Sequence, residues 1–366
     1  MLEKTCDLKE SRSQMSPKTI VIKVGSQLIM DDTTLMARVA SQVSQLIDSG
    51  HRCLIVSSGA ASMGKEKLSS FFGLSKTRSM KFDRELLTGL GQIKLMQTWQ
   101  SSFNLPVAQV LVDQFHLKSR ERFLLVKTQI LRLMNAGCVP ICNENDLLAL
   151  AADRINNNDY LAAVLAQMLS ADWLFLLTNV AGVYRDYPAR DGFISEISFE
   201  DSHLKNTCGK TSSEHGTGGM GEKVAAAQLA SKQGTHSVIC DSSVEFKHAI
   251  YENRVAGTRI TANESPTSKR QGWLNDISEV AGRVDIDPGA VKALTKAGAS
   301  LLVAGVTHIE GSFDSKQVIS IHCAATGTLI AKGFCKLSST QVALYLAKST
   351  NLDKPILVHR NDMVLV

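Results

Sequence analysis

The chain has 366 residues, a length that favours two domains, and 44% of them are hydrophobic, as in soluble globular proteins. A formal net charge of +5 is too mild for a nucleic-acid-binding stripe, and no apolar run is long enough to span a membrane. Residues 1–16 carry charges of both signs without an apolar signal-peptide run, so we expect a flexible tail and a cytoplasmic protein. The eight cysteines are scattered among mostly apolar residues, which favours reduced, buried thiols over a zinc site.

Short β-branched runs recur between residues 17 and 265, with helical patterns between them. The expected strands are 19–24, 53–58, 107–112, 138–143, 173–178 and 236–240, and a helical pattern covers 33–50. Because these strands are apolar throughout rather than alternating, they predict an α/β fold with a mostly parallel sheet sandwiched by helices. Ligands bind such sheets at the carboxyl ends of the strands.

The pattern changes near residue 265. Residues 266–279 begin with a polar, turn-rich stretch and are expected to form a linker. Residues 280–366 contain short strands with one or two helices, which predicts a small, mostly β second domain after a catalytic domain at 17–265.

Lys23 is the first candidate functional residue, near the end of the first expected strand and two places before Gly25. A buried ammonium group is costly unless it meets an anion, which favours a functional role. The alternative is a lysine at a sheet edge whose ammonium group reaches solvent.

Two aspartates in asparagine-rich motifs provide candidate carboxylates. Asp146 lies in "NEND" and Asp159 in "NNND". Either motif could instead form Asx turns or helix caps, and Asp159 directly precedes a helical pattern, so capping remains a rival for that residue.

The segment 216–223, "GTGGMGEK", precedes another helical pattern. Gly216 and Gly221 have the spacing of a P-loop, but Glu222 follows and the lysine comes one place late, at Lys223. Glycines still let backbone N–H groups approach an anion, and a helix N-terminus adds partial positive charge. The motif predicts a phosphate site that is not a Walker loop, with a flexible surface loop as the alternative.

Two lysines, glycine loops, and carboxylates beside amides suit phosphoryl transfer. No histidine falls in the strand-end motifs, so no general base stands out. A carboxylate acceptor, with a side-chain pKa of about 4.3, is already ionised at neutral pH and needs none. Lysines, backbone N–H groups and Mg²⁺ would then bring the two anions together and neutralise the transferring group.

Several motifs occur in a characteristic order: "VIKVGS", "VSSGAASMGK", "SRERF", "PICNENDLLA", "NNNDYLAA", "LLTNVAGVY", "GTGGMGEK" and "VHRNDM". With them, nearly all of residues 17–366 resembles the glutamate 5-kinase (gamma-glutamyl kinase) family. This family has the amino-acid-kinase fold followed by a C-terminal PUA domain. The resemblance implies ATP-dependent phosphorylation of the gamma-carboxylate of L-glutamate.

The resemblance also implies roles for individual residues. Lys23 and Lys223 bind the ATP phosphates and act in catalysis with Asp159, which organises them. The implied glutamate-binding residues are Ser58, Gly59, Ala60, Asn143, Asp146 and Asn158. The implied nucleotide-binding residues are Lys23, Gly25, Thr178, Asn179, Thr217, Gly218, Gly219, Met220, Gly221, Glu222 and Lys223. ATP is the co-substrate with Mg²⁺, and no residue is assigned as a metal ligand.

Further expectations follow from the resemblance. The product, gamma-glutamyl phosphate, opens proline biosynthesis, so proline is expected to inhibit at or near the glutamate pocket. We also expect a homo-oligomer, a dimer or tetramer, and functional coupling to glutamyl phosphate reductase.

The chain departs from the family pattern at a few positions. Gln27 replaces a hydroxylic residue, and Asn157 replaces the first aspartate of a "GDND" motif. Gly221 and Glu222 replace a small or hydroxylic pair, and "RDYP" replaces an "ADP" turn. Both lysines, Asp146 and Asp159 are kept.

Three alternatives remain open. The chain could phosphorylate another acid, acetylglutamate or aspartate, or could be a non-catalytic kinase. It could also bind RNA through the second domain, where nine basic and six acidic residues follow position 281. Those basic residues are dispersed and no aromatic stacking platform accompanies them, so nucleic acid is not the expected partner.

Overall fold

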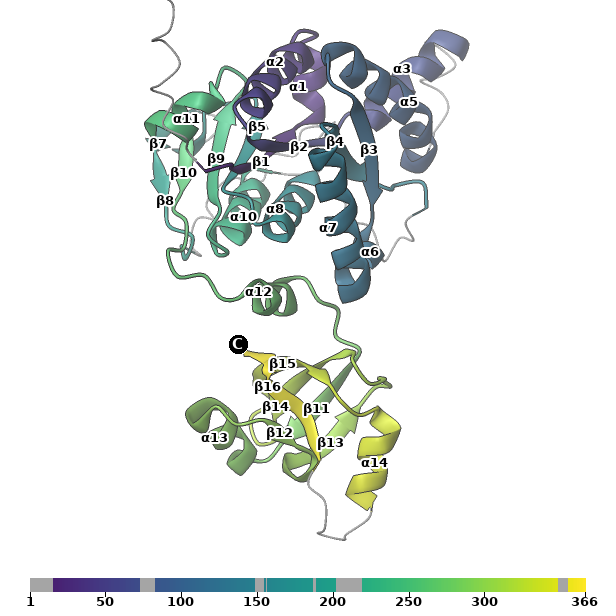
Figure 1. Cartoon of the computed structure of the whole chain (residues 1–366), viewed down its shortest axis with the longest axis vertical. Coiled ribbons are helices and arrows are strands. Elements are labelled where there is room, and N and C mark those ends of the chain that lie inside the picture. Colours follow the sequence, from purple (N-terminus) through teal and green to yellow (C-terminus); the bar gives the residue numbers. More distant parts are fainter. Residues whose placement is uncertain are drawn as a thin grey trace, which may run out of the picture.

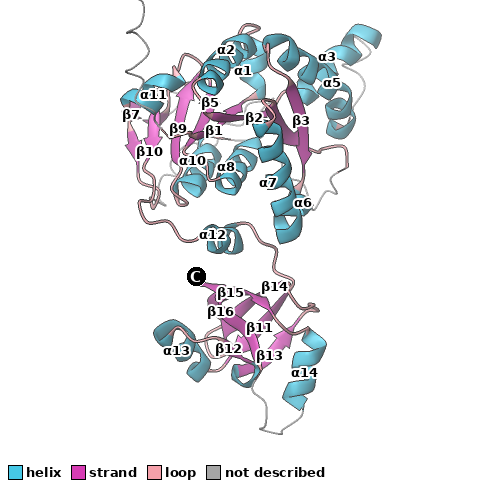
Figure 2. Ribbon diagram, viewed as in Figure 1, coloured by secondary structure: helices cyan, strands magenta, loops and turns pink. Residues whose placement is uncertain are grey.

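The computed structural model describes residues 16–72, 83–148, 155, 157–186, 189–201, 219–347 and 355–366. Figure 1 shows a larger body in which helices cover both faces of a sheet, and a smaller body built around a second sheet. The secondary-structure colouring in Figure 2 shows the strands at the centre of each body.

The larger sheet has eight strands in the order β3-β4-β2-β1-β5-β9-β10-β8. Their bounds are β1 Thr19–Val24, β2 Arg52–Ser57, β3 Val107–Val112, β4 Val139–Glu144, β5 Trp173–Thr178, β8 Glu196–Ile197, β9 His236–Asp241 and β10 Thr258–Ile260. Pairing is parallel from β3 through β9, and only β10 pairs antiparallel with β9 among these strands. A two-stranded hairpin, β6 Val183–Asp186 and β7 Asp191–Ile194, follows β5.

Strand β1 lies inside the sheet. Lys23 on this strand faces Val56 of β2 on one side and Leu176 of β5 on the other. The alternative of a lysine at a sheet edge is therefore wrong. Its neighbours in sequence alternate between two cores: Val21 packs in one, and Ile20 and Ile22 pack in the other.

Helices cover both faces of this sheet (Figure 1). One face carries α1 Ser26–Asp31, α2 Leu35–Asp48, α3 Ala60–Phe72, α5 Arg84–Ser102 and α11 Phe246–Glu252. The other face carries α6 Gln114–Lys118, α7 Arg120–Asn135, α8 Asn158–Leu169, α10 Met220–Ser231 and α12 Lys269–Asp276. Since both faces are buried, the strands read as continuous apolar runs rather than as alternating ones.

The smaller body has a six-stranded sheet in the order β12-β16-β15-β14-β11-β13. Its elements are β11 Gly282–Ile286, α13 Pro288–Ala297, β12 Leu301–Leu302, the 3₁₀ helix η2 Val303–Gly305, β13 Val306–Glu310, β14 Val318–Cys323, β15 Leu329–Cys335, α14 Ser339–Ala347 and β16 Ile356–Leu365. It has a hydrophobic core of its own, centred on Val284, Ile321 and Leu357.

The segment 266–279, expected to be a linker, contains helix α12. Ser268 and Gln271 form a capping box at its start, and Trp273 is buried in the core of the larger body. The indole Nε1 of Trp273 donates to the Leu117 carbonyl at 3.0 Å, and its ring stacks on Phe334 of β15 with centroids 5.9 Å apart. The helix was not predicted because its sequence is mostly polar and contains only a short apolar run, Trp273 and Leu274.

All six cysteines in the described ranges are free thiols, and burial raises the pKa of four of them, Cys53, Cys142, Cys240 and Cys335. Within those same ranges, no helix combines the length and the apolar character needed to cross a bilayer.

Candidate active site

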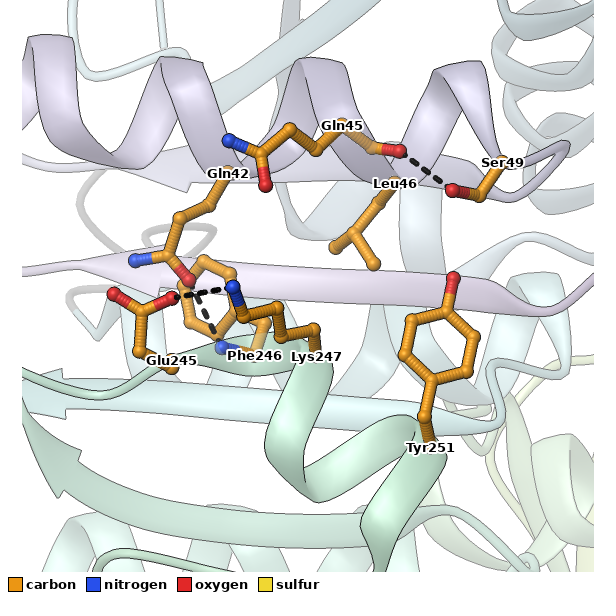
Figure 3. A pocket seen from close by; sticks show the side chains of 8 residues that line it. All are labelled: Gln42, Gln45, Leu46, Ser49, Glu245, Phe246, Lys247 and Tyr251. Atoms are coloured by element: carbon orange, nitrogen blue, oxygen red, sulfur yellow. Dashed lines mark hydrogen bonds and ion pairs between the residues drawn. The ribbon is translucent and has the colours of Figure 1, made fainter.

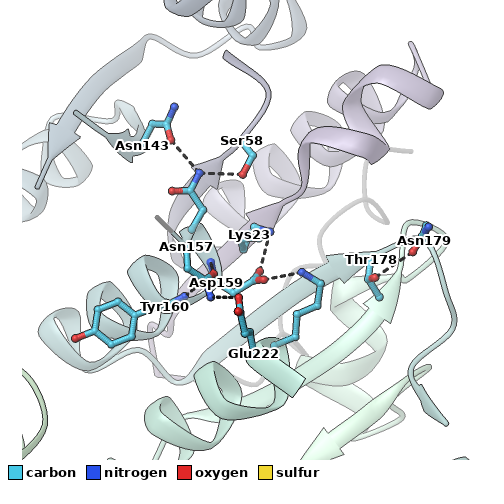
Figure 4. A network of polar contacts seen from close by, with 11 residues as sticks. Lys23, Ser58, Asn143, Asn157, Asp159, Tyr160, Thr178, Asn179 and Glu222 are labelled. Atoms are coloured by element: carbon cyan, nitrogen blue, oxygen red, sulfur yellow. Dashed lines mark hydrogen bonds and ion pairs between the residues drawn. The ribbon is translucent and has the colours of Figure 1, made fainter. Parts of the chain in front are cut away.

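Two lysines from distant parts of the chain meet at one buried carboxylate. Lys23 Nζ lies 2.7 Å from Asp159 Oδ1, and Lys223 Nζ lies 2.6 Å from Asp159 Oδ2. Lys23 lies on β1, Asp159 on α8 and Lys223 on α10, and Figure 4 shows Lys23 and Asp159 close to Glu222, the neighbour of Lys223. Asp159 is only 2% exposed. All three residues were candidates from the sequence, and in the structure both lysines contact Asp159.

Asn157 caps helix α8, which leaves the Asp159 carboxylate available. Asn157 Oδ1 accepts from the backbone N–H groups of Asp159 at 2.8 Å and Tyr160 at 3.3 Å. Asp159 lies in the first turn, where the helix N-terminus favours a negative charge. Asn157 therefore caps helix α8, and the side chain of Asp159 contacts the two lysines instead of capping the helix.

The cluster carries one more positive than negative charge. Burial alone would raise the pKa of Asp159, but the two ammonium groups outweigh it and hold that pKa well below its usual range. Burial lowers the pKa of Lys23 to about 8, reinforced by Lys223 and opposed by Asp159. Because a single carboxylate cannot neutralise two ammonium groups, the cluster is prepared to receive a further anion.

A network of amides and a hydroxyl lies beside the cluster. Asn158 Nδ2 donates to Ser58 Oγ and to Asn143 Oδ1, both at 2.9 Å (Figure 4). Asn143 Nδ2 donates to Gln92 Oε1 on α5 at 3.3 Å. Three of the residues predicted to bind glutamate are therefore directly connected, although they come from the ends of β2 and β4 and the start of α8.

Gly59 and Ala60 follow β2 and lead into α3. Gly59 has a φ of +103°, a conformation that side-chain-bearing residues rarely adopt, so glycine is required at this turn. Ala60 is buried at the first position of α3. The two residues form the turn between Ser58 and helix α3.

Asp146 lies just after β4 and is paired with a residue that the sequence reading did not single out. Asp146 Oδ1 stands 3.2 Å from Arg84 Nε at the start of α5. Burial raises the pKa of Asp146, while the Arg84 guanidinium and the Thr88 hydroxyl counteract that effect. One local signal could have found Arg84: a cation in the first turn of a helix opposes the helix dipole.

The predicted nucleotide-binding residues lie around the two lysines. Gly25 caps α1, and a Cβ built on it would stand 3.8 Å from Lys23 Nζ. Thr178 ends β5, and its Oγ1 donates to Asn179 Oδ1 at 3.4 Å (Figure 4). Gly219 caps α10, whose first turn contains Met220, Gly221, Glu222 and Lys223. Thr217 and Gly218 lie outside the described residues.

Two of the departures from the family pattern touch each other. Asn157 Nδ2 donates to Glu222 Oε2 at 2.8 Å, which links the start of α8 to the start of α10 (Figure 4). This contact turns the Glu222 carboxylate toward an amide.

The described residues contain no group of three His, Cys, Asp or Glu side chains arranged to hold a metal ion. The Asp159 carboxylate already receives two ammonium groups. Mg²⁺ can still act at this site, because it commonly binds through nucleotide phosphates and retained water rather than through an all-protein cage.

A separate hollow lies between α2 and α11 and is lined by side chains that include Gln42, Glu245, Phe246 and Tyr251 (Figure 3). Tyr251 Oη lies 2.8 Å from His51 Nε2, and His51 immediately precedes β2. The Tyr251 end of the hollow is therefore close to the amino end of β2, away from the carboxyl ends of the strands that carry the lysine cluster.

Comparison with known proteins places these features in a family. The model of the amino acid kinase family matches residues 18–241, and that of the PUA domain matches residues 282–352. The chain belongs to the amino acid kinase family. Together with the sheet topology, the two matches confirm the predicted fold class and the mostly β C-terminal domain.

Similar proteins share almost the whole length of this amino acid kinase. The glutamate 5-kinase of Methylobacillus flagellatus is 33% identical, with 96% of this chain and 99% of that protein covered. The glutamate 5-kinase of Vibrio vulnificus is 32% identical, with 98% of each covered. A solved structure of Giardia carbamate kinase is 17% identical, with a TM-score of 0.48 over 68% of this chain and all of that one.

Proposed function

We propose that this chain is an ATP-dependent glutamate 5-kinase. The glutamate 5-kinases that it resembles match it over nearly its whole length, including the PUA domain. The observation that carries the proposal is the convergence of Lys23 and Lys223 on the buried carboxylate of Asp159. Such a cluster binds and neutralises a polyphosphate rather than activating a nucleophile.

The lysines shield the charge of the transferring phosphoryl group. Lys23 and Lys223 contact the phosphates of ATP, while Asp159 holds both ammonium groups in place. Backbone N–H groups at the start of α10 add partial positive charge. Mg²⁺, when bound with the nucleotide, supplies further neutralisation of the phosphate oxygens.

The acceptor is held by the network at the ends of β2 and β4. Ser58, Asn143, Asn158 and Asp146 bind glutamate with its gamma-carboxylate directed toward the lysines. A carboxylate oxygen attacks the γ-phosphorus, the bond to the bridging oxygen breaks, and ADP leaves. The acceptor is ionised at neutral pH, so no general base is required, and the reaction is accelerated by alignment of the two reactants together with neutralisation of the phosphoryl charge.

The wider expectations form part of the same proposal. The product, gamma-glutamyl phosphate, is the first intermediate of proline biosynthesis, and proline inhibits by occupying the glutamate pocket. The enzyme acts in the cytoplasm as a homo-oligomer, and a reductase consumes its reactive acyl phosphate.

A coupled assay with ATP, Mg²⁺ and each candidate acceptor tests the proposal. Glutamate should support ADP formation and, with hydroxylamine present, yield the hydroxamate of an acyl phosphate, whereas aspartate and acetylglutamate should support little turnover. The glutamate reaction should slow when proline is added. Faster turnover with aspartate or acetylglutamate would assign the enzyme to a different acceptor, and no turnover with any acid would refute the kinase assignment.

A further inference from the structure

A polar stripe on helix α5 faces the acceptor side of the site. Arg84, Thr88 and Gln92 are spaced by four residues, so they share one face of the helix. Arg84 meets Asp146, and Gln92 meets Asn143. Thr88 and Gln92 are buried, at 4% and 8% exposure, which is uncommon for polar side chains.

Close packing between α3 and α5 fixes the position of this stripe relative to the turn at Ser58 and Gly59. A Cβ at Gly64 of α3 would stand 1.9 Å from the Leu87 carbonyl oxygen, and one at Gly91 of α5 would stand 1.8 Å from the Ala60 carbonyl oxygen. The two helices therefore touch through backbone atoms on both sides. Helix α5 cannot shift without disturbing Ala60, which follows the Ser58–Gly59 turn.

The pair of Arg84 and Asp146 is incomplete. Their contact at 3.2 Å is an ion pair without the alignment of a good hydrogen bond, and Thr88 Oγ1, which neighbours the same carboxylate, also has no well-aligned partner within the described part of the chain. Asp146 is 5% exposed, whereas the Arg84 side chain is 38% exposed. Buried polar groups are normally satisfied, so such a group of atoms beside an open guanidinium indicates a place for a ligand.

We propose that Arg84 binds the α-carboxylate of the acceptor while Asp146 binds its α-ammonium group. This inference rests on the proposed function and names an additional residue of the same site. A zwitterionic amino acid carries its two charges on adjacent groups, and Arg84 and Asp146 offer the opposite charges side by side. A guanidinium suits a carboxylate because its planar N–H groups can bind both oxygens.

Substrate analogues make the role of Arg84 measurable. 4-Aminobutyrate has the amino group and the distal carboxylate of glutamate but lacks the α-carboxylate. The wild-type enzyme should therefore prefer glutamate strongly over 4-aminobutyrate. Arg84→Met should raise the KM for glutamate by about 10- to 100-fold, as expected for loss of a charge-assisted bond, with little change in the KM for ATP.

Two further variants separate binding from folding. Arg84→Lys keeps the charge and should recover part of the glutamate affinity. Lys94→Met is the matched control, because it removes an exposed ion pair with Glu66 between the same two helices without contacting Asp146. It should leave both KM values within about two-fold of wild type. ATP binding by calorimetry and thermal melting would show that the Arg84→Met protein is folded.

The decisive quantity is the preference for glutamate over 4-aminobutyrate, measured as a ratio of kcat/KM values. A collapse of this ratio in Arg84→Met supports the inference. An unchanged ratio, in a folded variant that binds ATP, overturns the inference and leaves the kinase assignment intact. If the wild-type enzyme does not phosphorylate glutamate at all, the proposed function and this inference fail together.

Discussion

Asp159 is placed so that the site keeps a surplus of positive charge. A buried carboxylate with one lysine would form a balanced pair, but here it holds Lys23 and Lys223 together. Mutual repulsion between the ammonium groups is tolerated because Asp159 contacts both. The surplus charge makes the site receptive to phosphate and makes it sensitive to the protonation of Lys23.

ATP binding should weaken as the pH rises through about 8. The pKa of Lys23 is lowered to about 8, so in the free enzyme its ammonium group loses its proton near that pH. The deprotonated amine no longer attracts the phosphates, and affinity should fall from pH 7 to pH 9. Calorimetric titrations with ATP and Mg²⁺ across this range test the expectation. Lys23→Met should bind weakly throughout, with no inflection near pH 8.

The three members of the cluster should differ in their effects on stability. Asp159→Ala leaves two buried ammonium groups facing each other without a counter-charge, and should lower the free energy of unfolding by about 3–5 kcal/mol. Lys23→Met leaves the pair of Asp159 and Lys223 intact and should be neutral or slightly stabilising, while abolishing most turnover. Urea unfolding curves would measure both. Equal destabilisation by the two substitutions would contradict this charge balance.

The site residues predicted from the sequence carry a local signal, whereas the roles of those that were missed depend on contacts between distant parts of the chain. Lys23 and Lys223 stand out locally, since a lysine in a buried strand or in the first turn of a helix is unfavourable without an anion. Arg84 also lies in the first turn of a helix, but its partner Asp146, like the partner Asn143 of Gln92, is more than fifty residues away in the chain. Such pairings depend on how α5 crosses α3, and no local pattern encodes that crossing.

At the scale of elements, Asn157 joins the two helices that form the site. One end of its amide caps α8 and the other binds Glu222 at the start of α10. An aspartate at position 157 could still cap the helix, but it would place its charge against Glu222. Asn157 and Glu222 are therefore compatible as a pair, although each departs from the family pattern.

Asn157→Asp should weaken ATP binding because it sets two carboxylates in contact beside the nucleotide loop. A repulsion of about 1 kcal/mol corresponds to roughly a five-fold loss of affinity. Glu222→Thr removes that repulsion, so the double variant Asn157→Asp/Glu222→Thr should bind ATP better than Asn157→Asp alone. A double-mutant cycle on the ATP dissociation constant measures the coupling. Additive effects would show that the two residues act independently.

The parallel strands were accessible from sequence because each contains a short run of apolar residues. β1, β3 and β5 have the predicted bounds, and the ends of β2, β4 and β9 agree with the prediction to within one residue. The short strands β8 and β10 were not predicted. Strands of two or three residues are too short to show an alternating hydrophobic pattern in the sequence. The formation of β10 also depends on its pairing with β9.

At the scale of the whole molecule, helix α12 belongs to both bodies. Trp273 is 1% exposed within the larger core and stacks on Phe334 of the smaller sheet. Arg270 pairs with Asp362 of β16 at 2.7 Å, and Lys332 Nζ donates to the Asn275 carbonyl at 2.8 Å. The functional boundary of the kinase domain is therefore expected after α12 rather than before it.

Two truncations test this boundary. A chain of residues 1–279 retains α12 and should fold, melt cooperatively and phosphorylate glutamate. A chain of residues 1–265 lacks Trp273 and Leu274, both buried in the kinase core, and should lose several kcal/mol of stability, comparable to deletion of large core side chains. Thermal melting and turnover of the two chains would be compared. Equal stability would show that α12 contributes nothing to the kinase core.

The backbone contact at Gly64 and Gly91 has a bearing on protein engineering. Since even one methyl group would collide there, libraries that aim to retarget this catalyst to new acids should leave that crossing untouched. Diversity is better concentrated at the open end of the same helix, where Arg84 reaches solvent. The position of α5 relative to α3 would then stay constant, and changes in selectivity could be attributed to the varied side chains alone.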